Sequence, residues 1–171
     1  MKYDNSHMIS VIEEYEQTSE QLRNWIEEIL ENNKEKLIVA ESRGQIVGTI
    51  VFRSKSTKRL SHTGSFTAMV KKEYRNQGIG KLLIKELLNW AEHNTLIEKV
   101  SLGVLSTNQR AIELYKSMGF VEEGRKIKEV KLSLVMTYMW MIYLCINWFN
   151  PFFVQPFYQT ECYYIRLYFC L

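Results

Sequence analysis

Residues 69–83 read MVKKEYRNQGIGKLL, a pattern that predicts the end of a strand, a polar loop and the first turns of a helix. The backbone N–H groups that begin a helix have no acceptor within it, so they can surround a phosphate. Gly78 and Gly80 allow a ligand to approach the backbone closely, because glycine carries no Cβ atom. The helix dipole adds partial positive charge at the same place. The stretch therefore predicts a pyrophosphate site.

The spacing of these glycines excludes two familiar nucleotide-binding loops. A Walker A loop requires glycine where this chain has Arg75. A dinucleotide fingerprint that begins at Gly78 requires glycine or alanine where the chain has Leu83. The spacing fits the pattern Q/R-x-x-G-x-G/A through Arg75, Gly78 and Gly80. This pattern resembles the coenzyme A loop of the GNAT superfamily of N-acetyltransferases.

A second motif supports the resemblance. Residues 100–120 read VSLGVLSTNQRAIELYKSMGF, which predicts a strand, a helix that begins near Asn108, and Gly119 as its C-terminal stop. The run Ala-x-x-Leu-Tyr, which ends at Tyr115, is similar to the second motif of the family in order and distance. Two motifs together are far more specific than either alone. The resemblance extends over about residues 18–133.

The pattern of apolar residues and turn signals predicts an α/β fold. In chain order we expect a helix from the Thr18 capping box, strands at 36–41, 45–52 and 65–70, a helix at 80–94, a strand at 98–105, a helix at 108–118 and a strand at 120–132. This order gives a mixed, mostly antiparallel sheet flanked by helices. The GNAT resemblance implies that the sheet is splayed at the cofactor site.

The composition of the chain argues against several classes of function. The 171 residues suit one domain with a sizeable core. The net charge of +3 is too small to predict a nucleic-acid partner. The three cysteines have no metal-ligand spacing with histidine, so we expect no metal. Residues 1–11 lack the apolar segment of a secretion signal, and we expect a cytoplasmic protein. The sequence leaves a homodimer open.

The resemblance implies acetyl-CoA as co-substrate and assigns residues to it. The backbone of Met69 and Val70 would pair with the pantetheine arm, and the Asn108 side chain would contact that arm. Asn108 has a second role as helix N-cap, which is compatible with the first. The pyrophosphate would lie against seven consecutive residues: Arg75, Asn76, Gln77, Gly78, Ile79, Gly80 and Lys81.

Acetyl transfer from a thioester needs an unprotonated amine and a proton for the departing thiolate. The resemblance assigns the proton to Tyr115 as general acid; the alternative is a tyrosine that only packs in the core. The general base is not identified. His62, a water relay or Glu73 are candidates, although Glu73 fits a solvated charge better. The expected acceptor is a primary amine, on a small molecule or at a protein N-terminus.

The composition changes sharply after residue 133. Residues 134–171 hold only two charged residues, both prolines and all three cysteines. We therefore predict a domain in residues 1–133 and an aromatic, apolar tail in residues 134–171. Residues 134–154 carry no charge and follow several basic residues, which is typical of a membrane span. The alternatives are a last strand with an apolar extension, or a frameshift.

The frameshift hypothesis rests on the codons that the tail requires. GNAT domains normally close with one more strand, often with a Val-Asp-Asp-Leu-like run that leads to Met-Tyr-Lys. When residues 134–149 are read two bases out of frame, Met139-Trp140 yields valine, and Trp140-Met141 and Met141-Ile142 each yield aspartate. With A/T-rich codons the shifted run becomes SDDVHVDDLFMYKLV, after which a stop can follow. We prefer this hypothesis, with the shift near Leu134.

Two functions other than that of an active acetyltransferase are also compatible with the sequence. A degenerate member of the family would bind coenzyme A, or nothing, because a replaced closing strand would leave the sheet unpaired beside residues 120–132. A membrane-tethered interaction protein would use the same fold with residues 134–154 as its anchor. The N-terminus is also short for the family, since residues 1–17 leave little room for the strand and helix that usually precede the Thr18 helix.

Overall fold

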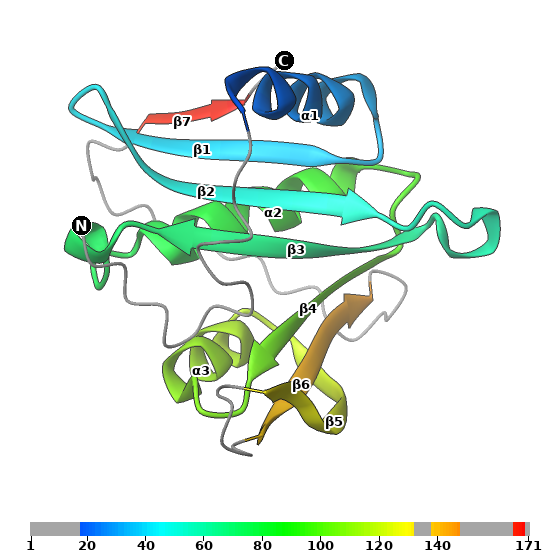
Figure 1. Cartoon of the computed structure of the whole chain (residues 1–171). Helices are drawn as coiled ribbons and strands as arrows, with labels where there is room; N and C mark the ends of the chain where they lie inside the picture. Colours follow the sequence, from blue (N-terminus) through cyan, green and yellow to red (C-terminus); the bar gives the residue numbers. More distant parts are fainter. Residues whose placement is uncertain (1–17, 132–137, 148–165, 170–171) are drawn as a thin grey trace. The chain divides into compact units, whose positions relative to one another are not determined.

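The computed structural model describes residues 18–131, 138–147 and 166–169 (Figure 1). These residues form two compact units. The first comprises residues 26–100 together with the short strand at 166–169. The second comprises residues 18–25, 101–131 and 138–146.

The first unit is built on four strands in the order β3-β2-β1-β7. Their bounds are β1 Lys36–Ser42, β2 Gln45–Ser54, β3 Thr63–Val70 and β7 Arg166–Phe169. Each neighbouring pair is antiparallel. The β1–β2 turn holds Arg43 and Gly44 at φ values of 51° and 77°, which suits the twist of a tight hairpin. The predicted hairpin is therefore confirmed.

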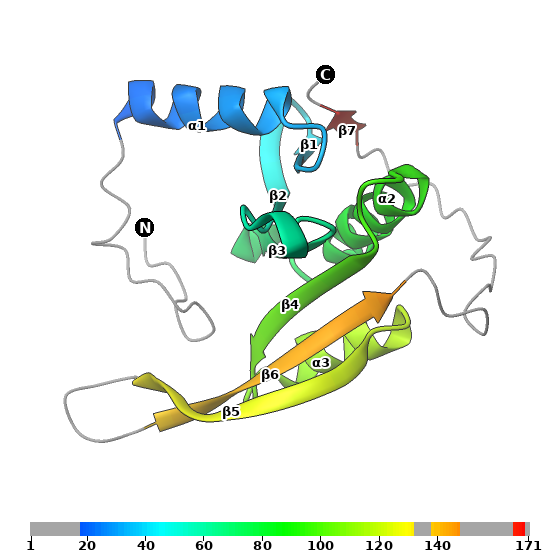
Figure 2. The same cartoon turned by 90° about the vertical axis from the view of Figure 1, so that its right-hand side faces the viewer.

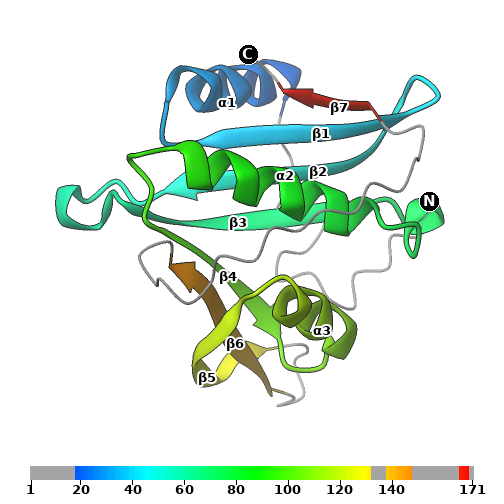
Figure 3. The ribbon, with the colours of Figure 1, turned by 180° about the vertical axis from the view of Figure 1, so that it is seen from behind.

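Helix α2, Ile79–His93, covers one face of these strands (Figure 3). Its apolar residues recur with helical spacing, so Leu83, Leu87 and Ala91 are all buried. Near its C-terminal end, Trp90 meets the Phe52 ring of β2 edge to face, with 5.5 Å between centroids. The core of the first unit thus lies between α2 and β2.

Helix α1, Ser19–Glu31, begins with the predicted capping box. The Gln21 N–H donates to Thr18 Oγ1 at 3.2 Å, and the Thr18 N–H donates to Gln21 Oε1 at 2.8 Å. On the first unit's portion of the helix, Ile29 is buried. Two 3₁₀ turns, η2 Lys58–Leu60 and η3 Lys72–Tyr74, precede and follow β3.

The second unit holds strands in the order β5-β6-β4, with helix α3 beside them (Figure 2). The bounds are β4 Lys99–Leu105, α3 Gln109–Ser117, β5 Val121–Lys131 and β6 Tyr138–Asn147. Strand β4 begins at the end of the first unit. Buried Leu105 packs against Val130 and Tyr143, which joins the three strands into one core. The α/β class with mostly antiparallel strands and flanking helices is confirmed.

Part of the predicted tail belongs to this sheet. Residues 138–147 form β6, which pairs antiparallel with β5 from Val121↔Cys145 to Lys131↔Tyr138. The expectation of an unpaired edge beside residues 120–132 is therefore wrong for this chain, because β6 supplies the partner. Ile142 and Leu144 are buried in a strand, whereas the 21-residue membrane span predicted for residues 134–154 would be a helix. Among the described residues, no helix is long and apolar enough to cross a membrane.

The remaining tail predictions concern residues outside the described ranges. Residues 132–137 and 148–165 are among these, so the boundary at 133 and the frameshift stay predictions. The shortened N-terminal segment, residues 1–17, also lies outside the described residues.

Candidate active site

The predicted phosphate loop lies in the first unit, between β3 and α2. We use the name phosphate loop for residues 71–81. It leaves β3 at Val70, passes through η3 and enters α2 at Ile79. Asn76 and Gly78 both have positive φ, 67° and 80°, on either side of Gln77. Left-handed residues in such a turn point successive N–H groups toward one side and form a concave anion site.

The backbone donors of this loop divide into two groups. Lys71 N–H donates to the Val47 carbonyl at 2.9 Å, and Tyr74 and Arg75 donate to the carbonyls of Lys71 and Lys72. The first internal bond of α2 runs from Leu82 N–H to the Gly78 carbonyl at 3.0 Å. Between these, the N–H groups of residues 76–81 have no acceptor within the described part of the chain. Six consecutive donors are thus available to an anion.

Side chains hold the shape of the phosphate loop. Arg75 Nε donates to the Val70 carbonyl at 3.2 Å, and Gln77 Nε2 donates to the Glu73 carbonyl at 3.1 Å. The loop also carries exposed cationic side chains, among them Lys71, Lys72, Arg75 and Lys81, against a single carboxylate at Glu73. This excess of positive charge favours an anionic ligand.

The two glycines of the motif have different structural roles. Gly78 is the N-cap of α2 with φ of 80°, a conformation that is strained for residues with a Cβ atom. Gly80 has no such φ, and a Cβ built there would meet Val70 Cγ2 at an ordinary 3.9 Å. The backbone conformation therefore favours glycine at position 78 but makes no such demand at position 80. Any demand for glycine at position 80 comes from a ligand.

Asn108 lies in the second unit, where it caps α3. Its Oδ1 accepts from the Ala111 N–H at 3.2 Å, and its carbonyl accepts from the Ile112 N–H at 3.1 Å. The predicted N-cap is confirmed. The contact of Asn108 with a pantetheine arm stays a prediction.

Tyr115 lies near the end of α3 and is half-buried. Its ring meets the buried Phe120 ring edge to face, and its carbonyl accepts from the N–H groups of Met118 and Phe120. Burial raises the pKa of the Tyr115 phenol above its usual 10.0, because the phenolate is poorly solvated there. The hydroxyl therefore keeps its proton at neutral pH, as a general acid must.

The structure places His62 away from the phosphate loop. His62 directly precedes β3, and its carbonyl accepts from the N–H groups of Glu98 and Lys99. Strand β3 then runs from Thr63 to Val70, about 23 Å at the usual rise of a strand, before the loop begins. His62 thus lies at the opposite end of the strand. The exposed side chain of Glu73 is compatible with a solvated charge.

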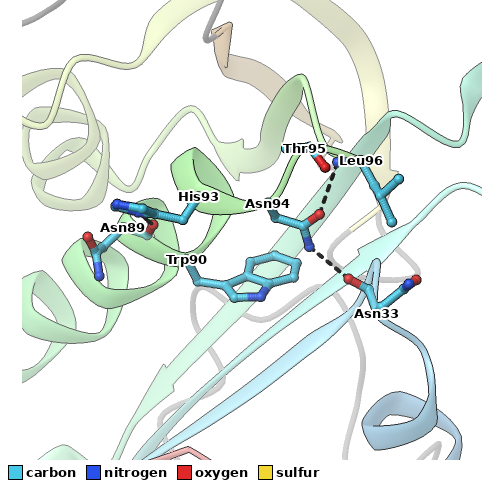
Figure 4. Close-up of a pocket in the computed structure, with 7 residues that line it drawn as sticks. All are labelled: Asn33, Asn89, Trp90, His93, Asn94, Thr95 and Leu96. Atoms are coloured by element: carbon cyan, nitrogen blue, oxygen red, sulfur yellow. Dashed lines mark hydrogen bonds between the residues drawn. The ribbon is translucent and has the colours of Figure 1, made fainter.

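A recess of about 460 Å³ lies at the other end of α2 (Figure 4). Its lining includes Trp90 and His93 of α2 and Asn33 of the α1–β1 turn. Asn94 closes it: Nδ2 donates to the Asn33 carbonyl at 2.7 Å, and Oδ1 accepts from the Leu96 N–H at 3.0 Å. Both hydrogen bonds are made within the protein, so the Asn94 side chain connects the end of α2 to the α1–β1 turn. The described residues contain no cluster of three or more potential metal ligands.

Sequence reasoning missed two residues that contact the phosphate loop or its flanking elements. Val47 is the extra residue of a β-bulge in β2, since Ala40 pairs with Gly48 and the next residue, Glu41, pairs with Ile46. Its carbonyl binds the Lys71 N–H. Gly48 faces α2 at close range. A glycine inside an apolar strand pattern was the available signal, because it often marks a bulge or a close backbone approach.

Comparison with known proteins agrees with the fold and with the order of the motifs. Residues 3–120 match the sequence profile of the acetyltransferase (GNAT) family. The chain belongs to this family. The match covers both candidate motifs, from the phosphate loop to Phe120.

Individual relatives are distant. The chain is 28% identical over 100 residues to the L-amino acid N-acetyltransferase AaaT of Escherichia coli, covering 58% of this chain and 62% of that enzyme. A GNAT acetyltransferase from Streptococcus pneumoniae superposes with a TM-score of 0.72 at 25% identity, over 78% of each chain. The yncA structure from Salmonella typhimurium, solved with its cofactor acetyl-CoA, superposes with a TM-score of 0.70 at 18% identity, over 85% of this chain and 80% of that one. The chain matches less than two thirds of the length of AaaT, and the yncA likeness concerns the fold alone.

Proposed function

We propose that this GNAT protein transfers the acetyl group of acetyl-CoA directly to a primary amine. The observation that carries the proposal is the row of N–H groups at residues 76–81, which have no acceptor among the residues that the structure describes. The cofactor class is proposed from family membership, and the structural relative yncA was solved with acetyl-CoA. The two motifs lie in different units, so each is assigned its role separately.

The phosphate loop would hold the cofactor by its pyrophosphate. The N–H groups of residues 76–81 would donate to phosphate oxygens, and the α2 dipole and the cationic side chains would add to the attraction. Gly80 would allow the pyrophosphate to approach the backbone. The exposed Met69 and its neighbour Val70 would pair through their backbone with the pantetheine arm, as Asn108 would through its amide.

Acetyl-CoA would supply an activated thioester. The neutral amine attacks the thioester carbonyl, a C–N bond forms and the C–S bond breaks. Tyr115 would donate its phenolic proton to the departing sulfur, so that the thiol leaves in neutral form. The proton lost by the amine would pass to water. Solvent then returns a proton to the phenolate.

The acceptor class is proposed on two grounds. The relative AaaT is an L-amino acid N-acetyltransferase, so its name indicates acylation of an amino-acid amine. The net charge of +3 is too small to predict a nucleic-acid acceptor. An amine on a small molecule or at a protein N-terminus is therefore the acceptor to test first.

Turnover with a panel of amines tests the proposal. The purified chain is mixed with acetyl-CoA and amino acids, polyamines or short peptides, and release of free thiol is followed. Thiol release that depends on one amine class, with the acetylated amine seen by mass spectrometry, supports it. Binding of coenzyme A without release for any amine would favour the degenerate member of the family. Absence of binding would overturn the cofactor assignment.

We also retain the frameshift as a proposal about the chain's origin, since the codons of residues 134–149 can encode a Val-Asp-Asp-Leu-Phe-Met-Tyr-Lys run in the shifted frame. Resequencing of the source DNA tests it. An inserted or deleted base near codon 134 is expected. An intact reading frame, together with an intact mass that includes the tail, contradicts the proposal. Partition of the full chain, but not of a chain ending at Ser133, into detergent would favour a membrane tether.

A further inference from the structure

We propose that Gly48 is a positioning residue that sets where the phosphate loop lies, an inference that rests on the function proposed above. Gly48 is a buried residue of β2, on the face covered by α2. It pairs with Ala40 of β1 on one side and with Val70 of β3 on the other. Val70 is the last residue before the loop, so Gly48 lies directly beside the loop's entrance.

The space at Gly48 is tight for a methyl group, so its neighbours would have to move by a few tenths of an ångström. A Cβ built there would lie 3.1 Å from Leu83 Cδ1, 3.1 Å from the Met69 carbonyl oxygen and 3.3 Å from Ile79 Cγ2. Leu83 and Ile79 are buried, 0% and 2% exposed, so neighbouring atoms restrict their movement. The Met69 oxygen belongs to the backbone. A methyl group at this position would therefore displace the first turns of α2, the end of β3, or both.

The bulge residue Val47 fixes the loop at a second point. Its carbonyl accepts from the N–H of Lys71, the first residue of the loop, at 2.9 Å. The bulge makes Val47 and Gly48 both buried, whereas regular alternation would expose one of them. Adjacent residues of β2 thus determine both ends of the loop: Val47 ties its first residue, and Gly48 sets how closely Ile79 approaches the sheet.

This arrangement matters because the loop binds through backbone donors. The N–H groups of residues 76–81 have fixed directions, and a side chain cannot change rotamer to compensate for their displacement. A shift of a few tenths of an ångström weakens several hydrogen bonds to the phosphates at once. We expect Gly48→Ala to raise the Kd of coenzyme A about tenfold, which corresponds to about 1.4 kcal/mol of binding free energy.

Phe52→Leu is the matched control. Phe52 lies on the same face of β2, but it meets Trp90 at the far end of α2. Both variants disturb the β2–α2 contact, so both lower the Tm. Only Gly48→Ala is expected to raise the Kd of coenzyme A, measured by calorimetry below the Tm. An equal rise of the Kd in both variants would show that Gly48 acts through stability alone and would overturn the proposal.

A second pair of variants tests the hydrogen bond from the Lys71 N–H to the Val47 carbonyl. This test does not depend on whether Gly48→Ala folds. Lys71 has φ of −53°, which proline can adopt, so Lys71→Pro removes the N–H donor with little backbone change. Lys71→Ala removes only the charge. Lys71→Pro is expected to raise the Kd several-fold beyond Lys71→Ala. Equal values would exclude a role for the Val47 bond.

Backbone amide resonances provide a readout that needs no cofactor. In the unliganded protein, Gly48→Ala and Lys71→Pro are expected to shift the amide signals of residues 76–81, and Phe52→Leu to shift those near Trp90. If the unaltered protein fails to bind coenzyme A, the proposed function fails, and these shifts alone decide the positioning role. Unshifted signals at 76–81 in both Gly48→Ala and Lys71→Pro would overturn it.

Discussion

The rings of Tyr115 and Phe120 meet edge to face, with centroids 5.8 Å apart and planes at 65°. Phe120 is buried at 2% exposure, so this contact fixes the tyrosine ring through its carbon atoms. This ring contact does not involve the hydroxyl, so it is retained when the hydroxyl is removed. This separates the structural contribution of Tyr115 from its proposed chemical role.

Tyr115→Phe tests that separation. We expect the rate of acetyl transfer to fall by about 10²–10⁴, because the general acid is removed. The Kd of coenzyme A and the Tm should change little, since the ring contact remains. Phe120→Leu is the control: it lowers the Tm but keeps the hydroxyl. An unchanged rate in Tyr115→Phe would remove Tyr115 from the mechanism.

The pH profile provides an independent test of the acid. Burial raises the pKa of Tyr115 above 10.0, so the phenol stays protonated through pH 9. The rate should rise with pH as the amine loses its proton, with no descending limb below pH 10. The pKa of Tyr115 is higher in the folded state than in the unfolded state. The contribution of the neutral phenol to the free energy of unfolding is therefore fully present below pH 10, and it is lost as the pH rises through the folded-state pKa. A descending limb below pH 9 that disappears in Tyr115→Phe would contradict the assignment.

The two loop glycines should respond differently to substitution. Gly78→Ala places a Cβ atom at φ of 80° and should destabilise the fold by about 1–2 kcal/mol, seen in denaturant unfolding. Gly80→Ala should not destabilise the fold, because its Cβ has room and alanine favours a helix. Gly80→Val should block coenzyme A binding while the protein stays folded. Normal binding by Gly80→Val would mean that the pyrophosphate lies elsewhere.

Asn108 has two assigned roles that a pair of variants can separate. Asn108→Ala removes the acceptor for the Ala111 N–H and should cost about 0.5–2 kcal/mol of unfolding free energy. Asn108→Asp keeps the cap but loses the amide donor. If Asn108 also contacts the pantetheine arm, the KM for acetyl-CoA rises in both variants, whereas the Tm falls only in Asn108→Ala. A normal KM in Asn108→Asp would leave the cap as its role.

Local patterns were sufficient to predict most of the fold. Every predicted boundary of a helix or strand between residues 18 and 131 lies within two residues of the observed one, because caps, turn glycines and apolar periodicity are local signals. Contacts between elements could not be predicted in this way. The role of Gly48 depends on how closely α2 approaches β2, and the pairing of β6 depends on β5. The general base has no local signature, so its identity could not be read from the sequence.

Leu144 provides a direct test of β6 in the chain as it stands. It is fully buried in β6, which pairs with β5, so Leu144→Ala should lower the free energy of unfolding by about 2–5 kcal/mol. Ile127→Ala is the control, because Ile127 is 66% exposed on β5 and its loss should cost less than about 0.5 kcal/mol. Denaturant unfolding measures both. Equal small effects would mean that residues 138–147 do not pack on the domain in solution.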